Sequence, residues 1–210
     1  ASSTNTDIEH VDLRPGENLN DQTAPDAPIF SMTALSDTGV SNNDGVTNNI
    51  KPIFSGVTEE YATIHLSIKG VLVGEYVTDK SGEWSISVAG LADGVHTVTA
   101  TSTDYSDNVS EPSLVTITID TTNPDIIVNS NYDYAENGTA VVFHVDATDA
   151  TDVTYALAGT DASLFSLDAN GNVSFINSPN YENAQDSGKN SIYDISVVAT
   201  DAAGNVSSKD

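Results

Sequence analysis

Carboxylates are the side chains of this sequence whose type and spacing could support chemistry. The 210 residues include 31 Asp and Glu but only 6 Lys and Arg, which gives a formal net charge of −25. There is no cysteine, which excludes disulfides, thiolate nucleophiles and sulfur-ligated zinc. Oxygen ligands in such excess favour a hard cation, Ca²⁺, as the element that stabilises small domains. A halophilic composition and an acidic face that binds no ion are the two alternatives.

The charge also narrows the classes of partner. An acidic surface repels phosphate and anionic lipid, so nucleic-acid binding and membrane-surface binding are disfavoured. The sequence has no run of about 18 apolar residues, and no membrane insertion is expected. Its first residues lack the basic and apolar stretch of a signal peptide, and the chain starts like a piece of something longer.

The residues that could support catalysis are scattered. The sequence contains none of the nucleophile-elbow, His-Glu-x-x-His or phosphate-loop motifs. Glu59 and Glu60 are adjacent, so in a strand they would point to opposite faces and could not act as an acid–base pair. The four histidines show neither ligand nor triad spacing: His10, His65, His96 and His144. We therefore predict that the protein is not an enzyme.

An internal repeat indicates how the chain is organised. The Asp-x-Thr-x-Pro-Asp hexamer at 21–26 returns at 120–125, and the Thr-Asp pair at 103–104 returns at 200–201, at nearly the same interval. Proline stiffens each hexamer and biases the residue before it toward extended geometry. We predict two related domains with a short Pro-containing linker between them. Their boundaries are 24–121 and 122–210, after a segment 1–23 that is a linker or the tail of a preceding region.

Short alternating or β-branched runs, separated by Gly, Asn or Asp, predict strands throughout both domains. The fold class is therefore all-β, with two antiparallel β-sandwiches in tandem. The predicted strands are 29–35, 50–55, 62–68, 71–77, 83–88, 95–102 and 113–119 in the first domain, and 126–129, 140–147, 153–157, 164–167, 172–176 and 192–200 in the second.

The second domain has one predicted strand fewer than the first. We expect it to lack its last strand and to expose a free sheet edge. The alternating run 7–13 either belongs to a preceding domain or pairs with that edge.

Three motifs of the first domain carry a family resemblance. They are LSDTGVSNNDGVT at 35–47, LADGVHTV at 91–98 and the closing DTTNP at 120–124. Through them residues 24–121 resemble the bacterial immunoglobulin-like repeats of very large Gram-negative surface adhesins. One departure is Asp107, which stands where the end motif of these repeats has glycine.

Five motifs of the second domain carry another resemblance. They are YAEN at 134–137, VDATDATD at 145–152, FSLD at 165–168, PNYE at 179–182 and VATD at 198–201. Through them residues 122–210 resemble a cadherin-like domain of the sort found in the same calcium-dependent, RTX-type adhesins. Departures are Asn180 in place of Asp, and Thr151 where a second Asp is expected, with Asp152 one place on.

The cadherin resemblance implies two groups of calcium ligands. One group lies at the end of the second domain that faces the first, and it consists of Asp149, Asp152 and Asp201 together with Asp120 and Asn123 of the linker. The other group, Glu136 and Glu182, lies at the opposite end.

Further candidate ligands lie in the first domain. Asp37 and Asp44 could hold an ion in the long loop there, although Asp beside Gly is also an ordinary turn former. Asp104 and Asn108 are additional candidates. Asp168, which precedes Gly in a predicted hairpin, is interpreted as a turn former.

The resemblances imply a calcium-rigidified extender module of a giant adhesin that supports bacterial attachment. Its partners would be neighbouring domains of the same adhesin, and its location extracellular, at the bacterial surface or secreted. The alternative is an adhesive module that itself binds a glycan, a peptide or a partner-cell ligand. Four tyrosines could supply its stacking surface: Tyr132, Tyr134, Tyr181 and Tyr193.

Overall fold

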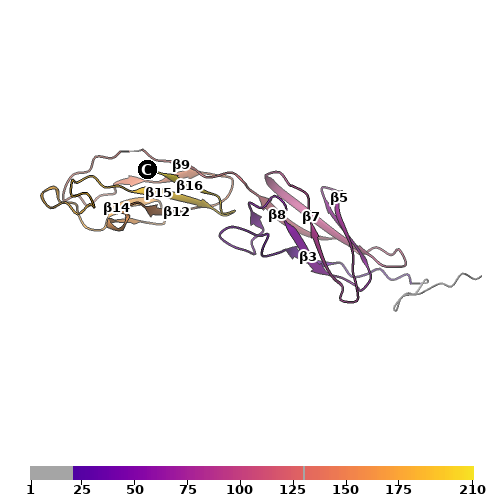
Figure 1. Ribbon diagram of the computed structural model, residues 1–210. Coiled ribbons are helices and arrows are strands. Elements are labelled where there is room, and N and C mark those ends of the chain that lie inside the picture. Colours follow the sequence, from indigo (N-terminus) through magenta and orange to yellow (C-terminus); the bar gives the residue numbers. More distant parts are fainter. Residues whose placement is uncertain (1–20, 130) are drawn as a thin grey trace, which may run out of the picture. The chain divides into compact units, whose positions relative to one another are not determined.

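The computed structural model describes residues 21–129 and 131–210, and the run 7–13 lies outside this part of the chain. The described residues are all-β, as the alternation predicts, with the 3₁₀ turns η1 (Ala162–Leu164) and η2 (Tyr181–Asn183) as their helical elements (Figure 1). Within the same ranges, no helix has the length and hydrophobicity needed to cross a membrane.

Eight strands form in the first half of the described chain. They are β1 (Ile29–Met32), β2 (Val46–Thr47), β3 (Ile53–Val57), β4 (Thr63–Ile68), β5 (Val71–Val77), β6 (Glu83–Ser87), β7 (Gly94–Thr103) and β8 (Ser113–Ile119). One sheet has the order β1-β3-β6 and the other β2-β8-β7-β4-β5. Lys69 and Gly70 both have positive φ and join β4 to β5, as a two-residue hairpin turn of the primed type requires.

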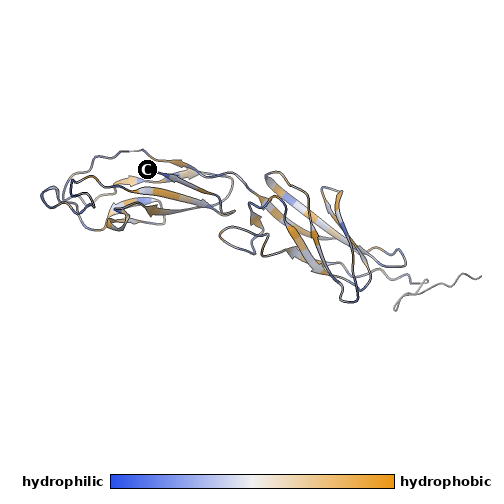
Figure 2. Cartoon of the chain, viewed as in Figure 1, coloured by the Kyte–Doolittle hydropathy of each residue, from blue (hydrophilic) through white to orange (hydrophobic). Residues whose placement is uncertain are grey.

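Alternation decides which residues of these strands are buried. In β4 every second side chain is buried, and β6 buries Trp84 and Ile86 between exposed neighbours. Hydrophobic residues accordingly lie along the strands, whereas loops are mainly hydrophilic (Figure 2). The fully buried side chains include Phe54, Ile64 and Leu66. Burial of this kind is the main stabilising term of a β-sandwich.

Eight further strands form in the second half. They are β9 (Asp125–Ile127), β10 (Phe143–His144), β11 (Asp146–Thr148), β12 (Val153–Ala158), β13 (Phe165–Leu167), β14 (Asn172–Phe175), β15 (Ser196–Asp201) and β16 (Val206–Lys209). They form three antiparallel sheets of order β10-β14-β13, β11-β9 and β12-β15-β16. Their common core consists of Ile126, Val145, Phe165, Val173, Val197 and Ala199.

The structure differs from the sequence prediction at β16. The prediction has no strand after residue 200, yet residues 206–209 pair antiparallel with β15. The reversal is made by the turn 201–205, in which the Asp201 N–H donates to the Asn205 carbonyl and Gly204 has φ 90°. Because a polar run of Val, Ser and Lys carries little hydrophobic alternation, the strand is set by this turn rather than by its own pattern.

The chain also divides into two compact units, each made of several segments. The first comprises the described residues through Ser31, Phe54–Ser87 and Thr97–Val115, and the second comprises Met32–Ile53, Val88–His96 and Thr116–Asp210. The domain boundary at 121/122 that the repeat predicts stays a prediction. The candidate site described below lies entirely within the second unit.

Candidate metal site

Three acidic side chains that are far apart in the sequence come together in the second unit. They are Asp120, Asp149 and Asp201, and each offers a carboxylate oxygen that lies within 4.8 Å of the other two. Asp201 is fully buried and Asp120 is 2% exposed, whereas Asp149 is partly exposed. We call these three residues the carboxylate cluster. It includes three of the ligands that the cadherin resemblance implied.

Strand pairing explains why these residues meet. Asp120 follows the last residue of β8 directly, and Asp149 follows the last residue of β11, which is paired with β9. Asp201 is the last residue of β15 and lies opposite Val153, the first residue of β12. The short loop between β11 and β12 therefore has to pass beside the end of β15. Because strand ends are fixed by their ladders, the cluster is positioned by backbone hydrogen bonds.

Asn205 holds the Asp201 carboxylate in place. The Asn205 backbone N–H donates to Asp201 Oδ1 at 2.8 Å, and its Nδ2 donates to Asp201 Oδ2 at 2.8 Å. The same Nδ2 donates to the Asp120 carbonyl at 2.9 Å. Asn205 thus joins two chain segments of the cluster. Sequence analysis missed this role, although the Asp-x-x-x-Asn spacing recurs in both repeats.

Thr151 links the other two carboxylates. Its hydroxyl lies 3.1 Å from Asp120 Oδ2 and 3.2 Å from Asp149 Oδ1. A hydroxyl has one proton, so it can donate to only one of them at a time. The Thr151 backbone N–H also donates to Asp149 Oδ1 at 3.0 Å. The position where the cadherin pattern expects a second Asp is therefore occupied by a residue that positions two carboxylates.

One oxygen of the cluster has no partner. Asp149 Oδ2 is buried and accepts no hydrogen bond from the described residues. A buried acceptor without a partner costs about 1–3 kcal/mol, and more when it is charged. Such an atom needs an explanation, and a bound cation is one that also accounts for the two carboxylates beside it.

The electrostatics of the cluster point the same way. Burial raises the pKa of Asp120, and the nearby charge of Asp149 adds to the increase, whereas hydrogen bonds from Thr122 and Thr151 oppose it. Among the described residues no Lys or Arg forms an ion pair with any of the three carboxylates. Like charges held together in this way favour a proton or a cation. Ca²⁺ takes oxygen ligands of this kind.

Four other predicted ligands of the second domain lie apart from the cluster. Asp152 and Asn123 are exposed and are not members of it. Glu136 and Glu182 are also exposed, and Glu136 Oε2 accepts a hydrogen bond from the Tyr181 N–H at 3.2 Å. The described residues bring no third acidic group to this pair. Their role as ligands stays a prediction.

Asp37 forms a separate buried acidic position with Asp44. Asp37 is 4% exposed, its Oδ2 accepts from the Gly45 N–H at 3.1 Å, and its Oδ1 is buried without a partner among the described residues. Burial raises the pKa of Asp37, and the charge of Asp44 adds to this. Asp44 caps its own turn by accepting from the Val46 N–H at 3.0 Å. Both the turn role and the ligand role of this pair are compatible with these contacts.

Asp104 and Asn108 repeat the arrangement of Asp201 and Asn205. The Asn108 N–H and Nδ2 donate to the two oxygens of Asp104 at 2.9 and 2.8 Å, and Nδ2 also donates to the Asp21 carbonyl at 3.1 Å. Asp107 has φ 65°, so it takes the left-handed conformation that glycine adopts in the family motif. We call each such Asp–Asn pair a clasp. No cluster of three carboxylates surrounds the Asp104 clasp among the described residues.

Asp168 closes a turn in the same manner. Its Oδ1 accepts from the Asn170 and Asn172 N–H groups at 2.9 Å each, and its Oδ2 accepts from Asn172 Nδ2 at 3.0 Å. The Asn172 side chain is the main reason that the pKa of Asp168 is lowered. These contacts agree with the interpretation of Asp168 as a turn former.

The comparisons with known proteins identify the class of the first domain. Residues 23–121 match the family model described as a bacterial Ig-like domain. This match confirms the Ig-like resemblance that the motifs of residues 24–121 indicated. The comparison with curated proteins gave no match.

Three solved structures illustrate the low-identity likeness of the whole chain. The C-terminal 282-residue fragment of intimin, in complex with the intimin-binding domain of its translocated receptor, is 12% identical, with a TM-score of 0.45. A 1.5-MDa bacterial ice-binding adhesin is 19% identical, with a TM-score of 0.42. EC1-2 of human protocadherin-24 is 18% identical, with a TM-score of 0.36.

These likenesses extend over most of this chain. They cover 89%, 89% and 88% of it, in the same order. The chain spans 63% of the intimin chain, 63% of the ice-binding adhesin chain and 94% of the protocadherin chain. The chain is thus an all-β protein with an Ig-like domain, similar to domains of adhesins and other cell-surface proteins.

Proposed function

We propose that this chain is a calcium-stabilised structural module of a bacterial cell-surface adhesin, acting outside the cell. The observation that carries the proposal is the buried, unpartnered Asp149 Oδ2 beside two buried carboxylates without a cationic side chain. The bacterial Ig-like match of residues 23–121 supports the adhesin assignment. A spacer role needs rigidity rather than a catalytic constellation, and a metal tie provides rigidity where disulfides are absent.

The carboxylates of Asp120, Asp149 and Asp201 would hold the ion. Ca²⁺ supplies two positive charges to a group that carries up to three negative ones. It would join the segment after β8 to the β11–β12 loop and to the end of β15, and Asn205 already ties two of these three segments. Without the ion, repulsion between the carboxylates would loosen the same segments. The module would then be more mobile and less stable.

Replacement of Asp149 by asparagine tests this assignment. The D149N protein should bind Ca²⁺ at least about tenfold more weakly, since one of three charged ligands is lost. In EDTA it should be as stable as the unmodified protein or more stable, because the substitution removes repulsion from Asp120. Calorimetric titration with CaCl₂ and thermal unfolding in EDTA measure the two quantities.

Asp152→Asn is the matched control, because Asp152 is exposed and lies outside the cluster. It should leave both quantities unchanged. Unchanged calcium affinity in D149N would contradict the assignment. So would an equal loss of affinity in D149N and D152N, since the effect would then come from net charge alone.

A further inference from the structure

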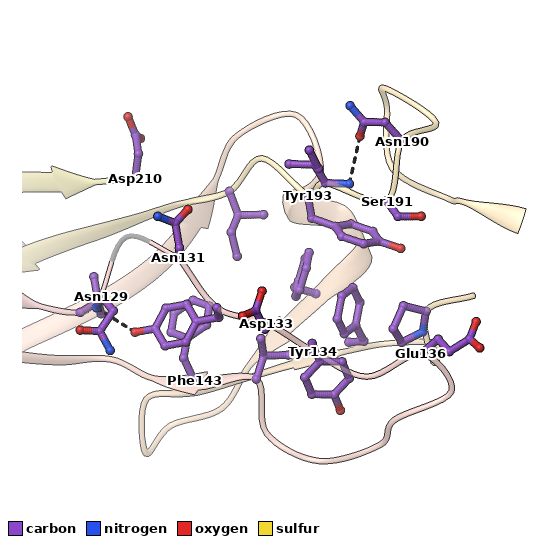
Figure 3. Close-up of a pocket in the computed structure, with 18 of the residues that line it drawn as sticks. Asn129, Asn131, Asp133, Tyr134, Glu136, Phe143, Asn190, Ser191, Tyr193 and Asp210 are labelled. Carbon is purple, nitrogen blue, oxygen red and sulfur yellow. Dashed lines mark hydrogen bonds between the residues drawn. The ribbon is translucent and has the colours of Figure 1, made fainter. Parts of the chain in front are cut away.

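A second feature of the chain lies at a distance from the carboxylate cluster in the sequence and has no part in the proposed calcium site. It is a cavity of about 780 Å³, open to solvent, between the segments 128–134 and 190–197 (Figure 3). Its apolar lining includes Phe143, Phe165, Phe175, Tyr193, Ile195 and Val197. We call this cavity the aromatic groove.

The groove is an opening into the core of the sandwich. Phe165 and Val197 are members of the buried core, and Phe175, Tyr193 and Ile195 pack against it. The rings of Phe165 and Phe175 are 4.3 Å apart, and those of Phe175 and Tyr193 are 4.9 Å apart. The groove therefore presents core surface to solvent, which an apolar occupant would cover favourably.

The backbone beside the groove is an unpaired sheet edge. Pairing between β15 and β16 ends at Val197 and Lys209, whereas the pairing of β15 with β12 continues to Ser196. Lys209 and Asp210 lie at the margin of the groove. The line of β16 thus points along the side of residues 193–196, where no strand of the described chain follows it.

The direction of the backbone groups along this edge follows from two hydrogen bonds. The Asp201 N–H bonds to Asn205 on the β16 side, and the Asp194 N–H and carbonyl both bond to Asp161 on the opposite side. Successive residues of a strand direct their backbone groups to alternate sides. The N–H and carbonyl of Tyr193 and Ile195 therefore face the groove side, and no hydrogen bond to them is found within the described residues.

We propose that the aromatic groove binds an extended strand of a partner protein, which adds antiparallel to residues 193–196 in line with β16. Backbone hydrogen bonds to Tyr193 and Ile195 would give the strand its register. Residues directly opposite each other in an antiparallel pair share one face of the sheet. The strand residues opposite Tyr193 and Ile195 would therefore point into the groove and should be apolar, with polar residues between them.

The charges around the groove define the occupant further. Asp133, Glu136 and Asp210 lie along it, and Lys209 is the basic residue of its lining. The Lys209 Nζ already donates to the Ile126 carbonyl at 3.2 Å. An occupant with Lys or Arg at its outward positions would complement this margin. A second copy of this chain, with its net charge of −25, would be repelled.

Ring packing favours a peptide over a glycan. The face of Tyr132 is stacked on Phe143, with ring centroids 4.6 Å apart and an interplanar angle of 15°. Tyr193 contacts Phe165 and Phe175 edge-to-face, with interplanar angles of 88° and 74°. Two of the tyrosines that could stack on a sugar therefore use their rings to pack against phenylalanines. What the groove offers is apolar volume next to free backbone groups.

Synthetic nine-residue peptides test the proposal on the 210-residue chain. The probe alternates Val or Ile with Thr or Lys, and its first control has the same composition with the apolar residues adjacent. Fluorescence polarisation should show binding of the alternating peptide at least about tenfold tighter than the control. A second control carries N-methyl groups on alternate backbone nitrogens, which removes the donors for strand pairing without changing the side chains, and it should also bind at least about tenfold more weakly.

Hydrogen exchange identifies the edge that is used. On binding, the amides of Tyr193 and Ile195 should exchange more slowly, whereas the Asp194 amide, already bonded to Asp161, should change little. Equal binding of all three peptides, no binding, or protection elsewhere would overturn the proposal. Self-association of the chain that blocks the peptide would also overturn it, as would a glycan that protects the same amides when the peptide does not bind. None of these outcomes depends on calcium, so the readout separates failure here from failure of the proposed function.

Discussion

Replacement of Asp201 by alanine is expected to lower the melting temperature by about 10 °C in EDTA and to abolish any further rise with calcium. Asp201 is fully buried, and its two oxygens accept the N–H and Nδ2 of Asn205. Hydrogen bonds to a charged group contribute about 1.5–3 kcal/mol each, and the loss of both leaves two buried donors unpaired. Differential scanning calorimetry, with EDTA and with excess calcium, measures both effects.

Asp104→Ala is the matched control for this experiment. It removes the same clasp from the other repeat, where Asp104 accepts the N–H and Nδ2 of Asn108. Because no cluster of three carboxylates surrounds Asp104 among the described residues, D104A should be destabilised in EDTA yet keep its calcium response. Retention of the full response in D201A would show that the cluster does not bind the ion.

Asp161→Ala should cause a destabilisation of similar or greater size without changing the calcium response. Asp161 is 2% exposed, its Oδ1 accepts from the Ser187 N–H at 2.7 Å, and its Oδ2 accepts from the Asp194 N–H at 2.9 Å. These two charge-assisted bonds hold the long segment 185–195 against the end of β12. Their loss should cost about 3 kcal/mol or more, measured by thermal unfolding with and without calcium.

Asp194→Ala separates the carboxylate from the backbone contact. The Asp194 side chain is exposed and its backbone N–H is the group that Asp161 accepts. D194A should therefore remain close to the unmodified protein in stability. A mild effect of D161A, or a loss of calcium response in it, would mean that the segment 185–195 is held by other contacts or is coupled to the cluster.

Much of the fold follows from local pattern. Alternation in runs such as 62–68 and 83–88 predicted β4 and β6, and the Gly-containing turns between them were recognisable from their sequence. The predicted single strand 140–147 is instead divided into β10 and β11, which pair with different strands. Which partner a strand takes depends on tertiary packing, and a local pattern does not carry that information.

The cluster was accessible to sequence reasoning only through a resemblance. Asp120, Asp149 and Asp201 were named because cadherin-like motifs contain them, not because their spacing places them together. Thr151 and Asn205 were missed, since an amide or hydroxyl that orients a carboxylate resembles any polar loop residue in the sequence. Asp161 was missed for the same reason, because its partners are backbone N–H groups of residues far along the chain.

A recurring motif also gained a structural explanation. Gly39, in the stretch 35–47, has φ 115°, and a side chain there would overlap the Ala202 carbonyl. The Val40 N–H donates to this same carbonyl at 3.2 Å. Glycine at this position thus allows close approach of the turn that carries Asp201 and Asn205. The motif therefore contributes to the surroundings of the cluster within the second unit.

The pH dependence of calcium stabilisation has a definite sign. Because the pKa of Asp120 is raised in the ion-free protein, this group contributes stability that is fully present below its ordinary value of 3.8 and is lost as pH rises through the raised value. Calcium requires the charged carboxylates and competes with the proton. The stabilisation by calcium should therefore be largest near neutral pH and should decrease as the pH falls toward the raised pKa of Asp120.

Thermal unfolding of the unmodified chain at neutral pH, in EDTA and across a CaCl₂ titration, tests the central claim most directly. Saturation at a hundred times the dissociation constant stabilises a protein by about 2.7 kcal/mol, which corresponds to a rise in melting temperature of about 10 °C for a domain of this size. The account predicts a rise of this order with Ca²⁺, and a much smaller one with Mg²⁺ or with NaCl of matched ionic strength. An equal rise in NaCl, or no rise with Ca²⁺, would contradict it.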